Sequence, residues 1–499
     1  MSRELFPLPS PPPADARLVQ PFPDAGVTAN TSQKLVEILK DNHEKWHCFW
    51  NKEDFHNHAT HHATALWALG ANEQALQKGY DRDKHFQVEA IKSPEEITKA
   101  NWRQHLGEER FYKAYLDFFT KVVQEQGPSS AIIDYIFAFD SNFEHPAMLS
   151  RLMGAAFHPL ITLGSGLEFG MHGLVAEGLA QAAVHKSESG DLLTPVFFKH
   201  CYEDVGITGG EKSQHATFSS RLDTLMHKLR AKPRQQQKDV HALTILSRVL
   251  KDEKLSGVKE TGFYDIYSNV AEKHHEALSD YAGQLTMNLK LGAAVQNKKE
   301  IEEKLEELAW AYSVMYGLSG WKRHQDFNAD FFMAHIVASA IFLPSILHKL
   351  EAPNQVLLLR AHFASALTWW VGRGRPNVDI AEFMSSSKEL PTNPTNPFLD
   401  IVQSAIVNEE SHVSEVQRTL RHWARMYGRK GANDPKLSAT ELKDADKLDG
   451  TLFTRVAELT KIRTSRQKEA MHEEDVMNLV FQTWDRSGYY ERPQTTLGS

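Results

Sequence analysis

Apolar residues recur every three to four positions along most of the chain, which is the period of an amphipathic helix. The pattern is clearest in six segments, at residues 32–50, 111–126, 173–185, 301–318, 354–372 and 413–428. No stretch alternates apolar and polar residues as a half-buried strand would, and no Asn-Gly or Asp-Gly pair is flanked by such alternation. The pattern therefore predicts an all-α fold.

Polar or Pro- and Gly-rich breaks separate the predicted helices without any long linker of low complexity. The breaks fall near residues 186–192, 205–216, 231–239, 376–397 and 429–450. We therefore predict one large helical domain over residues 30–499 with a buried polar pocket. A Pro-rich arm at residues 1–29 precedes it, and we expect the weakly patterned region 186–262 to form a lid or an interface.

The most apolar stretch, residues 331–347, contains a histidine and Pro344 and is shorter than the about 20 residues that span a bilayer. We read it as one buried helix. The N-terminal residues have no apolar core of the kind that a signal peptide needs. These features predict a soluble, cytoplasmic protein that does not act at a membrane.

Composition narrows the class of protein further. The chain has 499 residues, of which 41% are hydrophobic and 24% charged, as in globular proteins. A formal net charge of −8 argues against nucleic acid as a partner, because phosphate binding needs a basic surface. The two cysteines, Cys48 and Cys201, form no CxxC motif and no disulfide framework, which favours a reducing compartment.

The stretch FHNHATHHATALWALGA, at residues 55–71, packs four histidines into its first eight residues and then continues as apolar helix. His58 and His62 are four residues apart, so a helix would place them on one face. His61 lies one residue off that face. One such histidine is usually a hydrogen-bonded core residue, so the coincidence of several is what points to function.

Three further segments place ionisable residues in apolar surroundings. In chain order these residues are His158 and Glu168, then Asp330 and His335, then His412 and Glu415. Burying unrelated polar groups costs free energy, so one shared polar pocket inside the helical domain would account for all of them. The alternative is that each is a separate structural residue, and that the carboxylates near residue 412 form a solvated face.

Imidazole serves as a general acid or base, as a donor to a developing oxyanion and as a metal ligand. Three to five imidazoles with a carboxylate suit Fe(II), Cu(II) or Zn(II). The same residues without a metal would deprotonate a phenol. The chemistry of the pocket therefore stays open at this point.

Other catalytic templates match poorly. The glycine run GSGLEFG has GxGxxxG spacing and no βαβ unit around it, which argues against a dinucleotide or flavin Rossmann site. No P-loop, HExxH or GxSxG motif occurs. The runs Glu409–His412 and Glu272–His275 match the Glu-x-x-His of di-iron helix bundles, but such a site needs two further inward-facing glutamates. A di-iron bundle stays as an alternative.

Four long motifs carry a family resemblance: NHATHHATALWALGA, FHPLITLGSGLEFG, DFFMAHIVASAIFLP and SHVSEVQRTLRHWA. In this order they resemble the signature segments of the questin oxidase-like family of fungal secondary metabolism, and the resemblance spans roughly residues 30–425. It implies an oxygenase that opens a ring of an anthraquinone or its reduced anthrahydroquinone form. The formal reaction is a Baeyer–Villiger insertion that leads to a benzophenone or xanthone precursor.

The resemblance also implies NADPH as the source of reducing equivalents, with a reductase that supplies the hydroquinone as a partner. Some members of the family resemble non-haem iron enzymes with histidine ligands and a carboxylated lysine, and the resemblance implies for others a reaction without metal or flavin. This sequence has Glu415 where the family pattern places that lysine. A carboxylate ligand from Glu415, or loss of the iron site, would follow.

We therefore expect a Baeyer–Villiger-type monooxygenase that uses O2, with no flavin and no tightly bound cofactor. The expected catalytic residues are His58, His62, His158, Asp330, His335 and His412. The expected substrate-binding residues are His61, Trp67, Glu168, Phe331 and Trp369, whose aromatic members would sandwich a flat substrate. A pocket histidine would take a phenolic proton, and the resulting anion would pass an electron to O2.

Two alternatives remain from the sequence. One is a non-haem Fe(II) ring-cleaving dioxygenase, with iron held by His58, His158, His335, His412 and Glu415. The other is a helical carrier that binds an aromatic polyketide without catalysis. The ionisable residues in apolar segments argue against a simple carrier of a flat apolar ligand.

Overall fold

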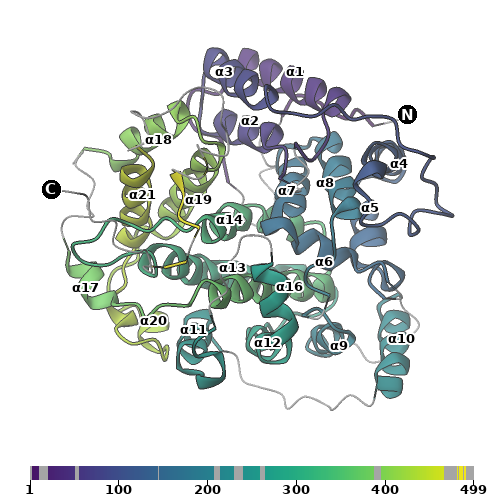
Figure 1. The fold of residues 1–499 in the computed structure, drawn as a ribbon. Helices are drawn as coiled ribbons and strands as arrows, with labels where there is room; N and C mark the ends of the chain where they lie inside the picture. Colours follow the sequence, from purple (N-terminus) through teal and green to yellow (C-terminus); the bar gives the residue numbers. More distant parts are fainter. Residues whose placement is uncertain are drawn as a thin grey trace. The chain divides into compact units, whose positions relative to one another are not determined.

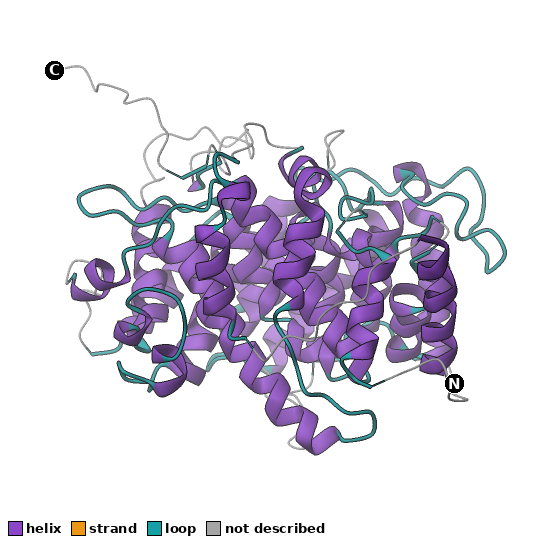
Figure 2. Ribbon diagram, turned by 90° about the horizontal axis from the view of Figure 1, so that it is seen from below, coloured by secondary structure: helices purple, strands orange, loops and turns teal. Residues whose placement is uncertain are grey.

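The computed structural model describes residues 3–9, 21–50, 55–143, 145–190, 192–206, 214–229, 240–258, 265–386, 395–465, 480, 483–486 and 488–489. Within these residues the predicted all-α fold is confirmed: they form helices and loops, with isolated β-bridges and no β-strand (Figure 2). None of the described helices is long and apolar enough to cross a membrane.

The chain divides into two compact units. The first comprises Met1–Asp239, Ala282–Leu305 and Ser339–Ala364, and the second comprises Val240–Tyr281, Glu306–Ala338 and Ser365–Ser499. The predicted arm is described at residues 3–9 and 21–29, and its other residues lie outside the described ranges. The role of residues 186–262 as a lid or interface stays a prediction.

Apart from α15 Leu343–Leu347, the helices that lie wholly in the first unit come from the N-terminal half of the chain, coloured purple to teal in Figure 1. They are α1 Ala29–Lys45, α2 Ala59–Ala68, α3 Glu73–Lys84, α4 Tyr112–Gln126, α5 Pro128–Ile132, α6 Met148–Met153, α7 His158–Phe169, α8 His172–Val184, α9 Pro195–Glu203 and α10 Gln214–Leu229. Helices α1, α2 and α3 lie side by side, and α4 and α7 both pack against α8.

The second unit holds the C-terminal helices, and four helices have residues in both units. Those of the second unit are α11 Ala242–Lys251, α17 Ile380–Ser385, α18 Pro397–Val407, α19 Ser411–Tyr427, α20 Pro435–Ser438 and α21 Thr451–Thr464. Those with residues in both are α12 Ile266–Gly283, α13 Ala294–Ser313, α14 Phe331–Ala340 and α16 Ala352–Gly372. Helices α18, α19 and α21 pack side by side (Figure 1).

Small residues let α7 and α8 approach each other closely. A Cβ atom on Gly178 would lie 2.6 Å from the backbone nitrogen of Leu163, and one on Gly166 would lie 2.6 Å from the backbone nitrogen of Val175. Real Cβ contacts are longer than this, so both positions require glycine. The glycine-rich motif of the sequence therefore serves close helix packing and fixes α7, which begins at His158.

Helical periodicity located the main elements correctly. The six predicted segments coincide with α1, α4, α8, α13, α16 and α19, and α13 continues into a π-helical turn at Val314–Leu318. The prediction of a single helix over residues 331–347 was wrong, because the structure has α14 and α15 instead. Pro344 has no N–H to donate to the carbonyl of Ala340, so the helix ends before it.

Candidate functional site

The first unit contains a direct contact between two predicted site histidines. His58 occupies the N-cap position of α2. Its Nε2 lies 3.0 Å from Nε2 of His158, the first residue of α7. His158 Nδ1 lies 2.5 Å from the carbonyl oxygen of Ala155. A carbonyl oxygen only accepts hydrogen bonds, so Nδ1 carries the hydrogen and Nε2 keeps the lone pair in the neutral ring.

The spacing of these two nitrogens has two chemical readings. In the first, His58 donates a hydrogen bond to His158 from a protonated Nε2. In the second, both nitrogens bind one cation, since two ligands about 2.1 Å from a metal and at a right angle lie about 3.0 Å apart. The observed 3.0 Å fits either reading.

A strained segment sets the position of His158. Ala155, Ala156 and Phe157 have φ values of 51°, 49° and 71°, in the left-handed region that residues other than glycine rarely adopt. Each such residue costs about 1–2 kcal/mol. Glu188 Oε2 accepts a hydrogen bond from the backbone of Ala155 at 3.0 Å, which helps to hold the turn. Strain of this kind is often found at functional sites.

Three further imidazole rings surround the pair. The ring of His61 lies 4.9 Å from that of His58, and His56 stacks on His158 at 4.5 Å and 9°. His185, just after α8, lies 5.5 Å from His56. Sequence reasoning did not select His56 or His185, although both occur within the histidine motifs.

His62 has a different partner from His58, although the two are four residues apart. Its Nδ1 lies 2.7 Å from Oδ2 of Asp83 on α3, and both side chains are largely buried. A Cβ on Gly79 would lie 2.9 Å from Cδ1 of Leu66, so glycine at this position lets α3 approach α2 closely. The structure thus brings His58, His61 and His158 together and directs His62 toward α3.

Two other predicted residues of this unit are buried. Trp67 donates from Nε1 to Ser32 Oγ at 3.3 Å and meets the edge of Phe169 at 5.3 Å. Glu168 is 5% exposed on α7. Trp67 thus packs as a core residue against neighbours of its own unit, and the predicted contact of both residues with substrate stays a prediction.

The second unit contains another histidine pair. The rings of His335 on α14 and His412 on α19 lie 4.5 Å apart at 62°, and both are buried. His335 Nδ1 donates to the carbonyl oxygen of Phe331 at 2.7 Å. His412 Nδ1 lies 2.6 Å from Oε1 of Glu410. Each Nδ1 thus has an oxygen partner, which leaves Nε2 with the lone pair in the neutral ring.

Glu410 is itself fixed in place. It is 2% exposed, and its Oε2 accepts a hydrogen bond from Trp484 Nε1 at 2.6 Å. A carboxylate or carbonyl on one ring nitrogen is the usual support of a metal-binding histidine. It also stabilises an imidazolium, so the same arrangement suits a general base. Sequence reasoning missed Glu410, because the run EESH contains two glutamates and does not show which of them faces inward.

Phe331 and Glu415 lie close to this pair in the chain. The Phe331 ring is 4.5 Å from that of His335 and 5.1 Å from that of His412, so it packs against both imidazoles. Glu415 is 5% exposed, one helical turn after His412 on α19.

Glu409 and Glu272, which the di-iron alternative requires as inward ligands, are exposed, so that alternative does not fit.

Asp330 anchors the start of α14. It is 0% exposed, and its Oδ1 accepts hydrogen bonds from the backbone of Phe332 at 3.1 Å and of Met333 at 3.2 Å. Its Oδ2 accepts a hydrogen bond from Arg373 Nε at 2.8 Å. These contacts of Asp330 position the start of α14, and hence His335. Trp369 stacks on Phe332 with ring centroids 4.2 Å apart at 11°.

A buried histidine that sequence reasoning did not select lies in the first unit. His362 on α16 is 0% exposed, and burial lowers its pKa to about 3. Its Nε2 lies 3.0 Å from Ser339 Oγ, and its ring lies 4.7 Å from that of Phe157. It therefore stays neutral at physiological pH and packs beside the strained turn that precedes His158.

The comparisons with known proteins match this chain over most of its length. A model of the questin oxidase-like family matches residues 55–420. Oxidoreductase AflY of Aspergillus parasiticus is 26% identical over 401 residues, which cover 78% of this chain and 72% of that protein. Baeyer-Villiger monooxygenase AacuH of Aspergillus aculeatus is 24% identical over 425 residues, which cover 80% of each.

Questin oxidase of Aspergillus fumigatus is 33% identical over 177 residues, which cover 34% of this chain and 38% of that protein. The resemblance inferred from the four motifs is therefore confirmed. The family match includes every segment that carries a predicted site residue, and the chain belongs to the questin oxidase-like family of oxidoreductases.

Proposed function

We propose that this protein inserts one oxygen atom beside a carbonyl of an anthraquinone-type ring, acting on the reduced hydroquinone form. The relatives named as questin oxidase and Baeyer-Villiger monooxygenase support this substrate class and reaction. The observation that carries the proposal is the Nε2–Nε2 contact of His58 and His158, in which the structure fixes the proton of His158 on Nδ1. Paired imidazoles can supply the base and the acid for oxygen chemistry on a phenol.

The proposed reaction balances without a flavin. The hydroquinone and O2 form a hydroperoxide on a ring carbon that bears a hydroxyl group. An aryl carbon then migrates to the nearer peroxide oxygen while the O–O bond breaks, and the distal oxygen leaves as water. The hydroquinone supplies the two electrons, and the product is a seven-membered lactone that hydrolysis opens. NADPH enters earlier, through a reductase that converts the quinone to the hydroquinone.

Imidazoles with a carboxylate on Nδ1 are suited to take the phenolic proton. His62 has Asp83 at 2.7 Å and His412 has Glu410 at 2.6 Å. The carboxylate stabilises the imidazolium that forms, and such proton transfer is worth roughly 100- to 10,000-fold in rate. A second imidazole, which we assign to the pair His58 and His158, would donate to the departing peroxide oxygen.

Iron is the second candidate for activating oxygen, and the geometry within each unit favours it. Three of the imidazoles proposed as ligands, those of His158, His335 and His412, have Nδ1 against an oxygen atom. Neutral imidazoles with a carboxylate suit Fe(II). The ligands would be His58, which is half-buried, and the buried His158, His335 and His412, with Glu415 as the carboxylate.

In that version the iron, when bound, would activate O2 for reaction with the substrate. The chain's part would be to hold the imidazoles of His158, His335 and His412 in one tautomer and to present the carboxylate of Glu415. Glu410 would support the ligand His412 through its Nδ1. Losing such a supporting group typically costs roughly 10- to 100-fold in metal affinity or activity. The proposed reaction and substrate are unchanged.

Oxygen uptake by chelator-treated protein separates the two versions. The substrate is a chemically reduced anthraquinone, and the protein is measured with and without added Fe(II). If imidazoles act only as acids and bases, the stripped protein turns over as fast as the untreated protein. If iron is required, activity is lost on stripping and returns only with Fe(II). A protein that binds the hydroquinone without changing its oxidation rate or products would be a carrier.

A further inference from the structure

Two buried N–H donors in the second unit have no acceptor among the described residues. They are Nε1 of Trp369 and Nη2 of Arg373. Trp369 is 4% exposed and Arg373 is 1% exposed. Leaving a buried donor unsatisfied costs free energy, and the cost is larger for a charged group, so such atoms are rare in folded proteins. An acceptor from outside the chain would resolve both.

The two donors belong to one face of one helical segment. The backbone N–H of Arg373 donates to the carbonyl oxygen of Trp369 at 2.9 Å, which continues the hydrogen bonding of α16 by one turn. Both side chains also contact Phe332. The Trp369 ring stacks on it at 4.2 Å, and the Arg373 guanidinium lies 5.2 Å from its centroid. The side chains that carry the two donors thus both contact the ring of Phe332 on α14.

Protein rings already pack against Trp369. Phe332 stacks on one face of the indole, and the ring of Tyr267 lies 5.2 Å away at 47°. The predicted role of Trp369 as a stacking surface for substrate stays a prediction. A role as a hydrogen-bond donor through Nε1 does not require a free face of the indole.

Charge decides which acceptor fits. The guanidinium of Arg373 is paired through Nε with the buried Asp330 carboxylate at 2.8 Å, so the cluster is neutral overall. A full anion would add an uncompensated buried charge, which is costly. A carbonyl oxygen adds none, and two donors aimed at it would also stabilise the negative charge that develops on it during reaction.

We propose that Trp369 Nε1 and Arg373 Nη2 bind a carbonyl oxygen of a flat aromatic ketone or quinone. The ligand class rests on the function proposed above, because formation of the hydroperoxide at one ring carbon of the hydroquinone leaves the opposite ring carbon as a ketone. The donor pair adds the residues that select for this carbonyl. Asp330 acts as a positioning residue, because it holds both Arg373 and the start of the helix that carries Phe332. The pair would distinguish a quinone from the same tricycle without oxygen.

The test uses two soluble probes of equal charge, anthraquinone-2-sulfonate and anthracene-2-sulfonate, which differ in the two carbonyl groups. Binding to the full chain is measured by calorimetry. We expect the wild-type protein to bind the quinone probe at least about 10-fold more tightly, and each lost hydrogen bond to reduce that ratio about 5- to 10-fold. Trp369→Phe keeps the stacked ring and removes Nε1. Arg373→Lys keeps a cation beside Asp330.

Trp370→Phe is the matched control. The neighbouring Trp370 is also fully buried, but its Nε1 already donates to Ser319 Oγ at 3.1 Å. Its removal should leave the ratio of the two affinities unchanged, and circular dichroism establishes that each variant is folded. The inference is overturned if the quinone preference survives in both Trp369→Phe and Arg373→Lys, or if the wild-type protein binds the two probes equally or binds neither. The proposed function is tested separately, by oxygen uptake with the hydroquinone, so the two can fail independently.

Discussion

At the scale of single residues, the site histidines differ in the oxygen atom that lies against the ring nitrogen Nδ1. A backbone carbonyl holds it in His158 and His335, and a carboxylate lies against it in His62 and His412. The carbonyl partners fix a neutral tautomer, whereas the carboxylate partners also favour the charged ring. The four imidazoles therefore fall into two chemical classes, which the sequence does not distinguish.

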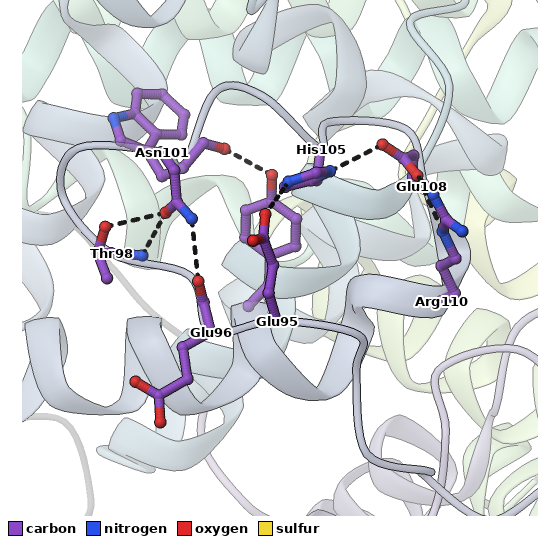
Figure 3. Close-up of polar contacts among 9 residues, drawn as sticks. Glu95, Glu96, Thr98, Asn101, His105, Glu108 and Arg110 are labelled. Carbon is purple, nitrogen blue, oxygen red and sulfur yellow. Dashed lines mark hydrogen bonds and ion pairs between the residues drawn. The ribbon is translucent and has the colours of Figure 1, made fainter.

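His105 provides a pH prediction outside the candidate site. It bridges Glu95 at 2.5 Å and Glu108 at 2.9 Å (Figure 3). Its ring also stacks on that of Phe111 at 3.8 Å. Burial opposes the charged ring, but the hydrogen bonds and charges of Glu108 and Glu95 outweigh it and raise the pKa of His105. Its stabilisation should thus be complete below about pH 6.5 and lost as pH rises through the higher folded-state pKa.

Comparing urea unfolding of the wild-type protein and His105→Gln at pH 6 and pH 9 checks this. The wild-type advantage should be larger at pH 6, by up to about 1 kcal/mol because both carboxylates are partly exposed to solvent. An advantage that is equal at both pH values, or larger at pH 9, would show that the ring is not charged in the folded state.

The sequence identified the residue types of the site and missed their partners. The i, i+4 spacing placed His58 and His62 on one face, but His58 lies at the N-cap, ahead of the regular helix, and so reaches α7 instead. Asp83 and Glu410 became visible only in the fold, because a hydrogen-bond partner distant in sequence leaves no periodic signal. His56 did have a signal, since it is one of the four clustered histidines.

At the scale of elements, the contact of α7 with α8 is what places His158. Replacing Gly178 by alanine would bring a Cβ to 2.6 Å from the backbone nitrogen of Leu163. Overpacking of this kind costs about 1–3 kcal/mol, more than the gain in helix propensity of about 1 kcal/mol. We therefore predict that Gly178→Ala lowers the free energy of unfolding and also lowers activity, because α7 must shift.

Gly431→Ala is the control for this prediction, since nothing lies within 4 Å of the added Cβ. Its free energy of unfolding should stay within about 0.5 kcal/mol of the wild-type value. Equal stability of the two variants by chemical denaturation would mean that the helices do not need to approach so closely.

Element boundaries were predictable where the hydrophobic period was long, as in α16 and α19. They were not predictable where one residue or a strained turn decides the path of the chain. Pro344 divides the apolar stretch into two helices, and the left-handed turn at Ala155–Phe157 has no sequence signal because alanine and phenylalanine rarely adopt it.

At the scale of the whole molecule, the candidate chemistry is distributed over both compact units. The first unit holds the contact of His58 with His158, and the second holds the pair His335 and His412 together with the donors Trp369 and Arg373. The four motifs that carry the family resemblance are thus the segments that supply the paired imidazoles. Composition predicted a globular protein, whereas the prediction of an oxygenase came from the four motifs.

The central claim is that the chain inserts one atom of O2 into a reduced anthraquinone ring. Mass spectrometry of the product formed under 18O2 tests it most directly, with a chemically reduced anthraquinone as substrate. The account predicts a lactone, or the acid from its hydrolysis, that carries a single 18O atom, with the other atom released as water. A product that carries two 18O atoms, or an unlabelled quinone as the sole product, would contradict it.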